Sequence, residues 1–307
     1  MAYATVRRLA AGLLTLFVLL TLSFFLLRAA PGGPLDRERA LPPRIEAAIA
    51  QRYHLDEPLA AQYTRYLVGV LRGDLGPSFQ YDGYQVAELI GAGLPVSALL
   101  GTLALLLALL LGVGLGALAA VRAGSGVDRL VSALAMTGLA LPNFVVAPLL
   151  ILLFALGLGW LPAGGWQRGA AGDLVLPVVA LALPQLAYVA RLTRSGLIGV
   201  LDSGFVLAAR ARGLPPARIL LRHALPPALL PVLSYLGPAA AGLITGSVVV
   251  EQVFGIPGVG RYFVQGALNR DYTLVLGVVL VYGALIVLFN LLVDLLYGLL
   301  DPRIRSR

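Results

Sequence analysis

The sequence contains no cysteine, no lysine and only two histidines, His54 and His223. Without cysteine there is no disulfide scaffold, no thiol nucleophile and no thiolate metal site, and two histidines do not make a histidine-rich cluster. Without lysine the chain cannot carry the G-x-x-x-x-G-K-[ST] loop that binds nucleotide phosphates. No carboxylate pair and no Ser/His/Asp grouping stands in a soluble domain. The sequence therefore predicts a chain that is not an enzyme and that binds no metal or cofactor of its own.

Charge is also scarce, because only 12% of the residues are charged while 59% are hydrophobic, with a mean hydropathy of +0.89. Soluble domains typically have about 25% charged and about 45–50% apolar residues, so a water-soluble globular protein is excluded. We expect an all-α polytopic membrane protein instead. A bilayer core of about 30 Å is crossed by roughly 20 apolar residues in a helix. Runs of this kind predict six transmembrane helices, at 9–27, 96–121, 131–157, 174–190, 227–250 and 274–297.

The first run follows Arg7 and Arg8, as the apolar core of a signal peptide would. That core is normally about 7–15 residues long. The 19 uncharged residues from Leu9 to Leu27 are long enough to span a membrane. We therefore expect a retained helix, and a cleaved signal peptide is the alternative, since Ala29 and Ala30 are small residues of the kind found at cleavage sites.

The arginines predict the orientation, because short cytoplasmic connections of membrane proteins are enriched in basic residues. With the N-terminus inside, the inner segments 1–8, 122–130, 191–226 and 298–307 hold 13 arginines in 63 residues. The short outer segments 158–173 and 251–273 hold 3 in 39. Both termini are thus expected in the cytoplasm. The pI of about 10.1 is then a signal of topology, and it does not indicate nucleic-acid binding.

The predicted organisation has three parts: an N-terminal transmembrane helix at 1–27, an extracytoplasmic helical segment at 28–95 and a five-helix core at 96–307. Pro42-Pro43 and Pro58 each precede apolar residues at helical spacing, which predicts two amphipathic helices in the middle part. The residues of these helices are Ile45, Ala48, Ile49 and Tyr53, and then Leu59, Tyr63, Tyr66, Leu67 and Leu71. Binding of a partner and simple structural packing both fit this segment.

Small residues predict where the membrane helices pack, because helices in lipid associate by close backbone approach. The expected packing positions are Ala104, Ala108, Gly112 and Gly116 in the second span and Gly242 and Gly246 in the fifth. A contact within the chain and a contact with a second subunit are both open. Within the predicted spans, Asp294 is the one ionisable residue, and it lies one turn after Asn290. Since a mid-membrane charge costs about 2.5–3.5 kcal/mol, we expect Asn290 and Asp294 to face the protein interior.

The inner connection 191–226, with 36 residues, is the most informative segment. Asp202-Ser203 are suited to cap a short helix, Gly213 to end it in a left-handed conformation, and Pro215-Pro216 to begin the next helix, which Pro226-Pro227 are expected to stop. Two short helices with apolar and arginine side chains resemble a docking element for a cytoplasmic protein. The alternative is a loop in the lipid interface, with its arginines on acidic head groups.

The amino-acid sequence of this connection resembles that of a known family. Ala208-Ala209, Gly213 and, nine residues later, His223-Ala224-Leu225-Pro226 resemble the E-A-A-x-x-x-G-x9-I-x-L-P loop of membrane subunits of bacterial ATP-binding-cassette (ABC) importers. Leu207 stands at the position of the glutamate and His223 at that of the isoleucine. Other segments, in matching order over nearly the whole chain, resemble the first permease subunit of dipeptide and oligopeptide importers: Leu27–Gly32, His54–Leu59, Leu71–Gly76, Val253–Gly260, Arg270–Tyr272 and Asp301–Arg303.

The resemblance implies the type I ABC importer permease fold in the bacterial cytoplasmic (inner) membrane, and a coupling helix within 203–221 that inserts into an ATPase subunit. The residues that it assigns to the ATPase-coupling loop are Phe205, Leu207, Ala208, Ala209, Gly213, Leu214, His223, Leu225 and Pro226. Ala208 and Ala209 would form the small contact surface. The implied partners are a homologous second permease, one or two ABC ATPases that bind ATP and Mg²⁺, an extracytoplasmic peptide-binding protein and membrane lipid.

The expected function is therefore transport of dipeptides or oligopeptides, powered by a separate ATPase. Nickel chelates, glutathione and some sugars are alternative cargoes of the same importer type. An ion-coupled secondary carrier and a membrane assembly factor that does not transport are the alternatives from other classes. A secondary carrier normally needs several intramembrane acids or broken helices around an ion site, whereas the predicted spans hold one acid away from the centre.

Overall fold

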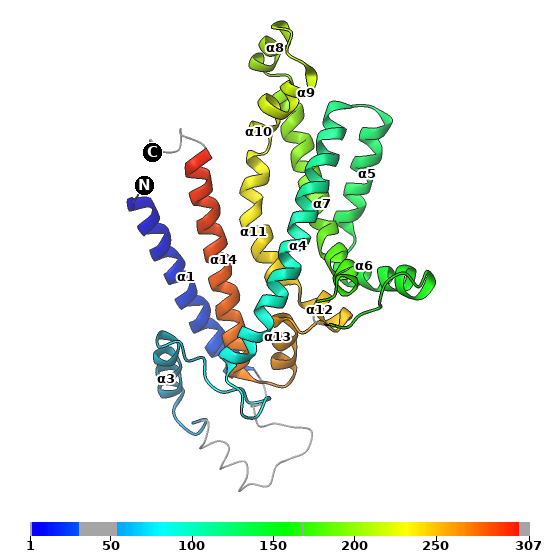
Figure 1. Cartoon of the computed structure of the whole chain (residues 1–307). Helices are drawn as coiled ribbons and strands as arrows, with labels where there is room; N and C mark the ends of the chain where they lie inside the picture. The colour runs from blue at the N-terminus through cyan, green and yellow to red at the C-terminus, as the bar shows by residue number, and fades with distance from the viewer. Residues whose placement is uncertain (1, 31–53, 168, 301–307) are drawn as a thin grey trace. The chain divides into compact units, whose positions relative to one another are not determined.

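The computed structural model describes residues 2–30, 54–167 and 169–300, and every regular element in these ranges is a helix. The long helices are α1 (Ala2–Ala29), α4 (Val86–Val121), α5 (Gly126–Ala140), α7 (Ala171–Leu201), α11 (Leu230–Gly246) and α14 (Tyr272–Leu300) (Figure 1). The shorter ones are α3 (Leu59–Leu71), α6 (Asn143–Leu150), α8 (Gly204–Ala211), α9 (Pro216–Arg218), α10 (Leu225–Ala228), α12 (Val248–Phe254) and α13 (Val259–Leu268), with π-helical turns η1 (Ile151–Gly157) and η2 (Ile219–Ala224).

The described residues contain five helices that are long and apolar enough to cross a membrane, and a bent pair provides a sixth candidate. The span predicted at 131–157 corresponds to this bent pair, in which α5 and the α6–η1 helix meet at 105°. The break lies at Leu141-Pro142, where Leu141 is extended with ψ 116°. A residue before proline disfavours the helical conformation, since its backbone clashes with the proline ring.

Contacts divide the chain into two units, one of Met1–Val96 and Pro257–Val287 and one of Ser97–Ile256 and Leu288–Arg307. This division differs from the three parts predicted, because the segment 28–95 groups with the first helix and with 257–287. In the first unit α1 packs along α14. A Cβ added to Gly283 of α14 would lie 2.6 Å from the side chain of Leu19 of α1. Helix α3 packs on the end of α1, with the Tyr63 ring edge-on to Phe24 at 5.2 Å.

The predicted amphipathic helix after Pro58 is confirmed as α3, whereas the one predicted after Pro42-Pro43 lies outside the described residues. Tyr63 and Tyr66 face Phe24 of α1, and Leu71 is 80% exposed. The hydroxyls of Thr21 and Tyr63 are joined by a hydrogen bond of 2.8 Å. The aromatic face of α3 is thus its packed face.

In the second unit α7 lies between α4, α5 and α11 (Figure 1). It reaches Leu201, so the predicted inner connection does not begin at 191, and the segment that joins α7 to α11 is Asp202–Leu229. The fifth candidate span runs from Leu230 to Phe254 and includes Glu251, which is fully buried. Glu251 lies just beyond the predicted span 227–250, so this buried carboxylate was not among the predicted intramembrane residues.

Candidate functional site

The connection Asp202–Leu229 is built from turns that its residues dictate, and it lies beyond the end of α7 (Figure 1). Ser203 occupies the N-cap position of α8 with extended backbone, as predicted, although its hydroxyl donates to the Val200 carbonyl at 2.5 Å. Gly213 has φ +77°, so the expectation of a left-handed residue after α8 is confirmed. Pro216 begins α9, because its fixed φ suits the first turn of a helix, whose N–H groups have no partner inside the helix.

The end of this connection differs from the expectation. Pro226-Pro227 do not stop the helix, which passes from the π-helical η2 into α10 and reaches Ala228. Both prolines lie in the first turn of α10, where a missing N–H is tolerated. His223 and Leu225 are half-buried and Pro226 is exposed. The chain therefore remains helical at both prolines on its way to α11.

A buried apolar cluster holds the connection on the membrane helices. Val206 and Ala209 of α8 pack with Leu197 of α7 and Ala120 of α4, and Leu214 is packed against them. Further members are Ile219, Ala224 and Ala228. Removal of apolar surface from water contributes about 25 cal/mol per Å², so this cluster stabilises the packing of the connection on the ends of α4 and α7.

The opposite face of α8 is exposed. Phe205 and Leu207 are 51% and 53% exposed, and Ala208 lies between them and Arg210 on the surface. Ala209 is 1% exposed, so its side chain belongs to the interior of the connection and not to the contact surface predicted for it. The same connection exposes four arginines: Arg210, Arg212, Arg218 and Arg222. We call Phe205, Leu207, Ala208 and these arginines the α8 surface; exposed large apolar side chains with a charged rim are typical of protein interaction sites.

The predicted packing stripe of α4 lies against α7. Ala104 and Ala108 are fully buried. A Cβ at Gly112 would lie 2.8 Å from Val189 Cβ, and one at Gly116 would overlap the carbonyl oxygen of Ala190. The α4 and α7 backbones thus approach so closely at both glycines that a side chain does not fit.

The other predicted packing and polar residues differ in their surroundings. Gly242 is exposed and has no neighbour near its missing Cβ, so it makes no helix contact inside the described chain. Asn290 is exposed, so the expectation that it faces the interior is wrong for the described chain, although its Oδ1 lies 3.3 Å from the place that a Cβ at Gly237 of α11 would take. Gly246 and Asp294 are helical, but their surroundings lie outside the described part of the chain.

Two polar contacts of the second unit were not predicted. Asp128 of α5 accepts two hydrogen bonds from Arg194 of α7, from Nε at 2.5 Å and from Nη2 at 2.8 Å. The buried Glu251 carboxylate accepts from Ser97 of α4 at 2.6 Å and from Ser247 at 2.5 Å. The Asp128–Arg194 and Ser97–Glu251 contacts join residues that are 66 and 154 positions apart. A buried carboxylate is stable only where hydrogen-bond partners compensate for its lost contact with water. Both contacts therefore fix the positions of the helices that they join.

In the first unit, the buried carboxylate of Asp271 organises the loop before α4. Its Oδ2 accepts from the hydroxyl of Ser78 at 2.5 Å and from the N–H groups of Phe79 and Gln80 at 3.0 Å. Its Oδ1 accepts from Thr273 Oγ1 at 3.0 Å and from the Leu274 N–H at 3.1 Å, which caps α14. One side chain thereby ties a loop and a helix start that are about 190 residues apart.

We expect Asp271→Asn to loosen this loop, since an amide has one acceptor oxygen for two sets of donors. Leaving a buried donor unpaired costs about 1–3 kcal/mol. Limited proteolysis of the purified complex should cut within 77–85 faster than in the wild type. Asp82→Asn, at an exposed carboxylate of the same loop, is the matched control. Equal cleavage rates of the two variants would contradict the role of Asp271.

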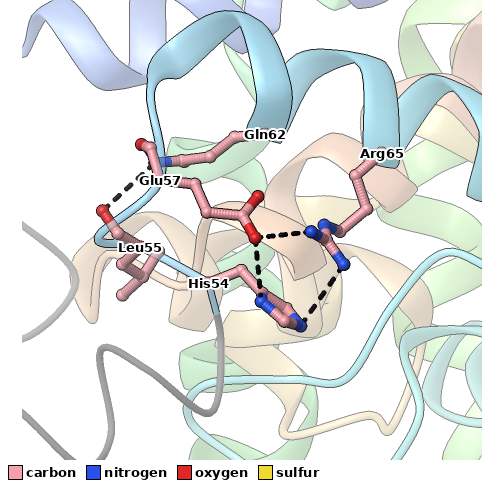
Figure 2. Close-up of polar contacts among 5 residues, drawn as sticks. All are labelled: His54, Leu55, Glu57, Gln62 and Arg65. Atoms are coloured by element: carbon pink, nitrogen blue, oxygen red, sulfur yellow. Dashed lines mark hydrogen bonds and ion pairs between the residues drawn. The ribbon is translucent and has the colours of Figure 1, made fainter.

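A second polar cluster precedes α3. Figure 2 shows His54, Glu57 and Arg65 pointing toward one another: Arg65 Nη2 lies 2.5 Å and His54 Nδ1 lies 3.1 Å from Glu57 Oε1. The hydrogen bond from Arg65 holds the pKa of the Glu57 carboxyl below its usual range. Gln62 donates to the carbonyls of Leu55 and Glu57. The cluster fixes the turn that leads into α3.

The cluster borders a cavity of about 300 Å³ that includes Arg28, Gln62, Arg65, Tyr66 and Asp74. Burial raises the pKa of the Tyr66 hydroxyl. No group of three or more histidine, aspartate or glutamate side chains in the described ranges could hold a metal ion.

Comparison with known proteins supplies the family. Residues 112–306 match the family described as "binding-protein-dependent transport system inner membrane component". The chain is 53% identical over 299 residues to the oligopeptide transport system permease protein OppB of Salmonella typhimurium, covering 97% of this chain and 98% of that protein. It is 40% identical over 305 residues to the dipeptide transport system permease protein DppB of Bacillus subtilis, covering 99% and 98%.

Two solved structures share the fold. One is the MetNI methionine ABC transporter in an inward-facing conformation, with a TM-score of 0.56 and 22% identity, covering 69% of this chain and 96% of that chain. The other is an amino acid ABC transporter crystallised with histidines, with a TM-score of 0.53 and 24% identity, covering 68% and 92%. At these identities the likeness concerns the fold alone.

Proposed function

Since this chain belongs to the family of binding-protein-dependent transport system inner membrane components, we propose that it is the permease subunit of a peptide importer whose energy comes from a separate ATPase. The observation that carries the proposal is the near full-length identity of 53% to an oligopeptide permease. The absence of lysine supports the division of labour, because a phosphate-binding loop needs one.

The α8 surface is the docking site for the ATPase in this proposal. Phe205 and Leu207 offer apolar contacts, and the exposed arginines suit an acidic rim on the partner. Because α8 is packed on α7 and α4, closure of the ATPase would move the inner ends of these helices. ATP binding then shifts the equilibrium between inward- and outward-facing states through differential contacts at this surface.

The arginine distribution supports cytoplasmic termini and an α8 surface on the cytoplasmic side of the membrane. The segments 28–95 and 251–273 then face outward, where an extracytoplasmic binding protein delivers the peptide. The second permease that completes the passage is a homologue of this chain, and ATP and Mg²⁺ bind to the ATPases.

The cargo is proposed from the relatives, whose names specify oligopeptides and dipeptides. Uptake of labelled dipeptides, pentapeptides, glutathione and nickel by host cells with and without the gene tests this assignment. We expect deletion to abolish the uptake of one peptide class, and restoration of the gene to recover it. Unchanged peptide uptake together with lost nickel or glutathione uptake would reassign the cargo.

A further inference from the structure

The exposed side chains of the second unit fall into two chemical classes. Those of α4, α5 and the α6–η1 helix are mostly leucines, as expected for helices that face lipid tails. The most exposed of these leucines are Leu106, Leu110, Leu130, Leu134, Leu149, Leu152, Leu153 and Leu156, and Val121, Met136 and Phe144 are similarly exposed. Helix α11 exposes no large aliphatic side chain, and α7 exposes only Val175, near its start.

Helix α7 instead exposes a polar stripe. At 100° per residue, Tyr188, Arg191, Ser195 and Gly199 share one face of this helix, and all four are exposed. Gln185 is half-buried beside Tyr188. Tyr188 is near the middle of the candidate span, where a lipid-facing helix carries aliphatic residues and not hydrogen-bonding ones.

Helix α11 exposes a second stripe of the same character. Pro231, Ser234, Pro238 and Gly242 lie within about 80° of its circumference, and all are exposed. The Ser234 hydroxyl donates to the Leu230 carbonyl of its own helix, so it contributes no contact to a neighbouring helix of the described chain.

The two stripes meet at three side chains. The rings of Tyr188 and Tyr235 stack with centroids 4.2 Å apart, and the Tyr235 hydroxyl donates to Gln185 Oε1. Other sides of both helices are packed: Val189 lies on Gly112 of α4, Ala187 on Gly138 of α5, and Gly237 on Asn290 of α14. The stripes therefore form one continuous surface that the described chain leaves open. We call it the α7/α11 wall.

We propose that the α7/α11 wall lines the water-filled passage of the importer and that the peptide backbone contacts it at Tyr188, Tyr235 and Gln185. Phenol and carboxamide groups both donate and accept hydrogen bonds, as peptide amides do. Amides are common to all peptides, so such a wall accepts cargo of varied sequence. A lipid-facing position is disfavoured, because this face of the candidate span Ala171–Leu201 carries Tyr188 and Arg191, and a charged side chain that faces lipid is costly whereas one beside water is not. The identity of the cargo rests on the proposed function.

The natural absence of cysteine makes the wall directly testable. Ser195→Cys and Ser234→Cys replace one atom each and place a thiol on either stripe. Leu110→Cys is the matched control, because Leu110 is 75% exposed and its neighbour Gly112 lies at the depth of Val189, next to Tyr188. The complete complex in lipid nanodiscs is treated with a charged methanethiosulfonate reagent, and the mass of this subunit reports its labelling.

Since the thiolate is the reactive form and apolar surroundings suppress it, we expect both wall cysteines to react at least about tenfold faster than the control. Bound peptide should slow the reaction at Ser234→Cys. Wall cysteines as slow as Leu110→Cys would overturn the proposal, since the wall would then face lipid or a second subunit. Fast labelling that peptide does not slow would overturn the peptide contact. Peptide uptake by the wild-type complex is measured separately, so that a failure of the proposed function is recognised on its own.

Discussion

Replacement of Gly213 by valine is expected to reduce ATP-driven peptide uptake at least about tenfold, although the complex still assembles. Gly213 has φ +77°, a conformation that costs an L-residue about 1–2 kcal/mol and a β-branched residue more. Relief of this strain would rotate α8 away from the cluster that joins it to α7 and α4. The measurement is uptake into liposomes together with the yield of the purified complex.

Gly204→Val is the matched control for this change. Both glycines have open space around a missing Cβ, but Gly204 has no left-handed backbone. It begins α8 in an exposed position, so valine there should be tolerated. Uptake that is unchanged in a well-assembled Gly213→Val complex would exclude this connection as the coupling element.

The second large effect is expected for Gly116→Val, which should prevent the complex from assembling. A side chain at this position overlaps the Ala190 carbonyl oxygen and lies 2.8 Å from Thr193 Cβ. Backbone atoms cannot give way as a flexible side chain can, so α4 and α7 must separate. Overpacking typically lowers the free energy of unfolding by about 1–3 kcal/mol. Here the contact between α4 and α7 would be lost as well. Size-exclusion chromatography and thermal unfolding of the purified complex measure the effect.

Gly114→Val, two residues earlier in α4, is the matched control. It makes the same change in helix propensity without affecting the contact with α7. Gly114 is exposed and has no neighbour within 4 Å of a Cβ, so valine should be accommodated there. Equal loss of assembly in both variants would mean that glycine is required for flexibility of α4 and not for its contact with α7.

Local chemistry explains which parts of the fold could be predicted. Long apolar runs predict the spans, because a helix needs roughly 20 apolar residues to cross the bilayer core. Proline and glycine predicted the turns around α8, since these residues restrict or free single backbone angles. The stripe through Gly112 and Gly116 predicted a packed face, because small residues at one helical spacing define a close approach.

The missed features depend on residues far apart in the chain. Nothing near Asp271 indicates that Ser78 and Gln80 approach it, and nothing near Glu251 points to Ser97. Ala209 was assigned to the surface because the family pattern does not distinguish the two faces of a short helix. The α7/α11 wall was missed for the same reason: exposure depends on the neighbours of a helix, and Tyr188 and Tyr235 meet only in the folded chain.

The most direct test of the account is peptide accumulation in liposomes that contain this chain, the second permease and the ATPase, supplied with the loaded binding protein. We predict accumulation that requires ATP on the side of the α8 surface and that stops when the ATPase is omitted. Accumulation by this chain without the ATPase, driven by a proton or sodium gradient, would contradict the account and indicate a secondary carrier. A complete complex that hydrolyses ATP at a rate independent of the peptide and imports none would equally contradict it.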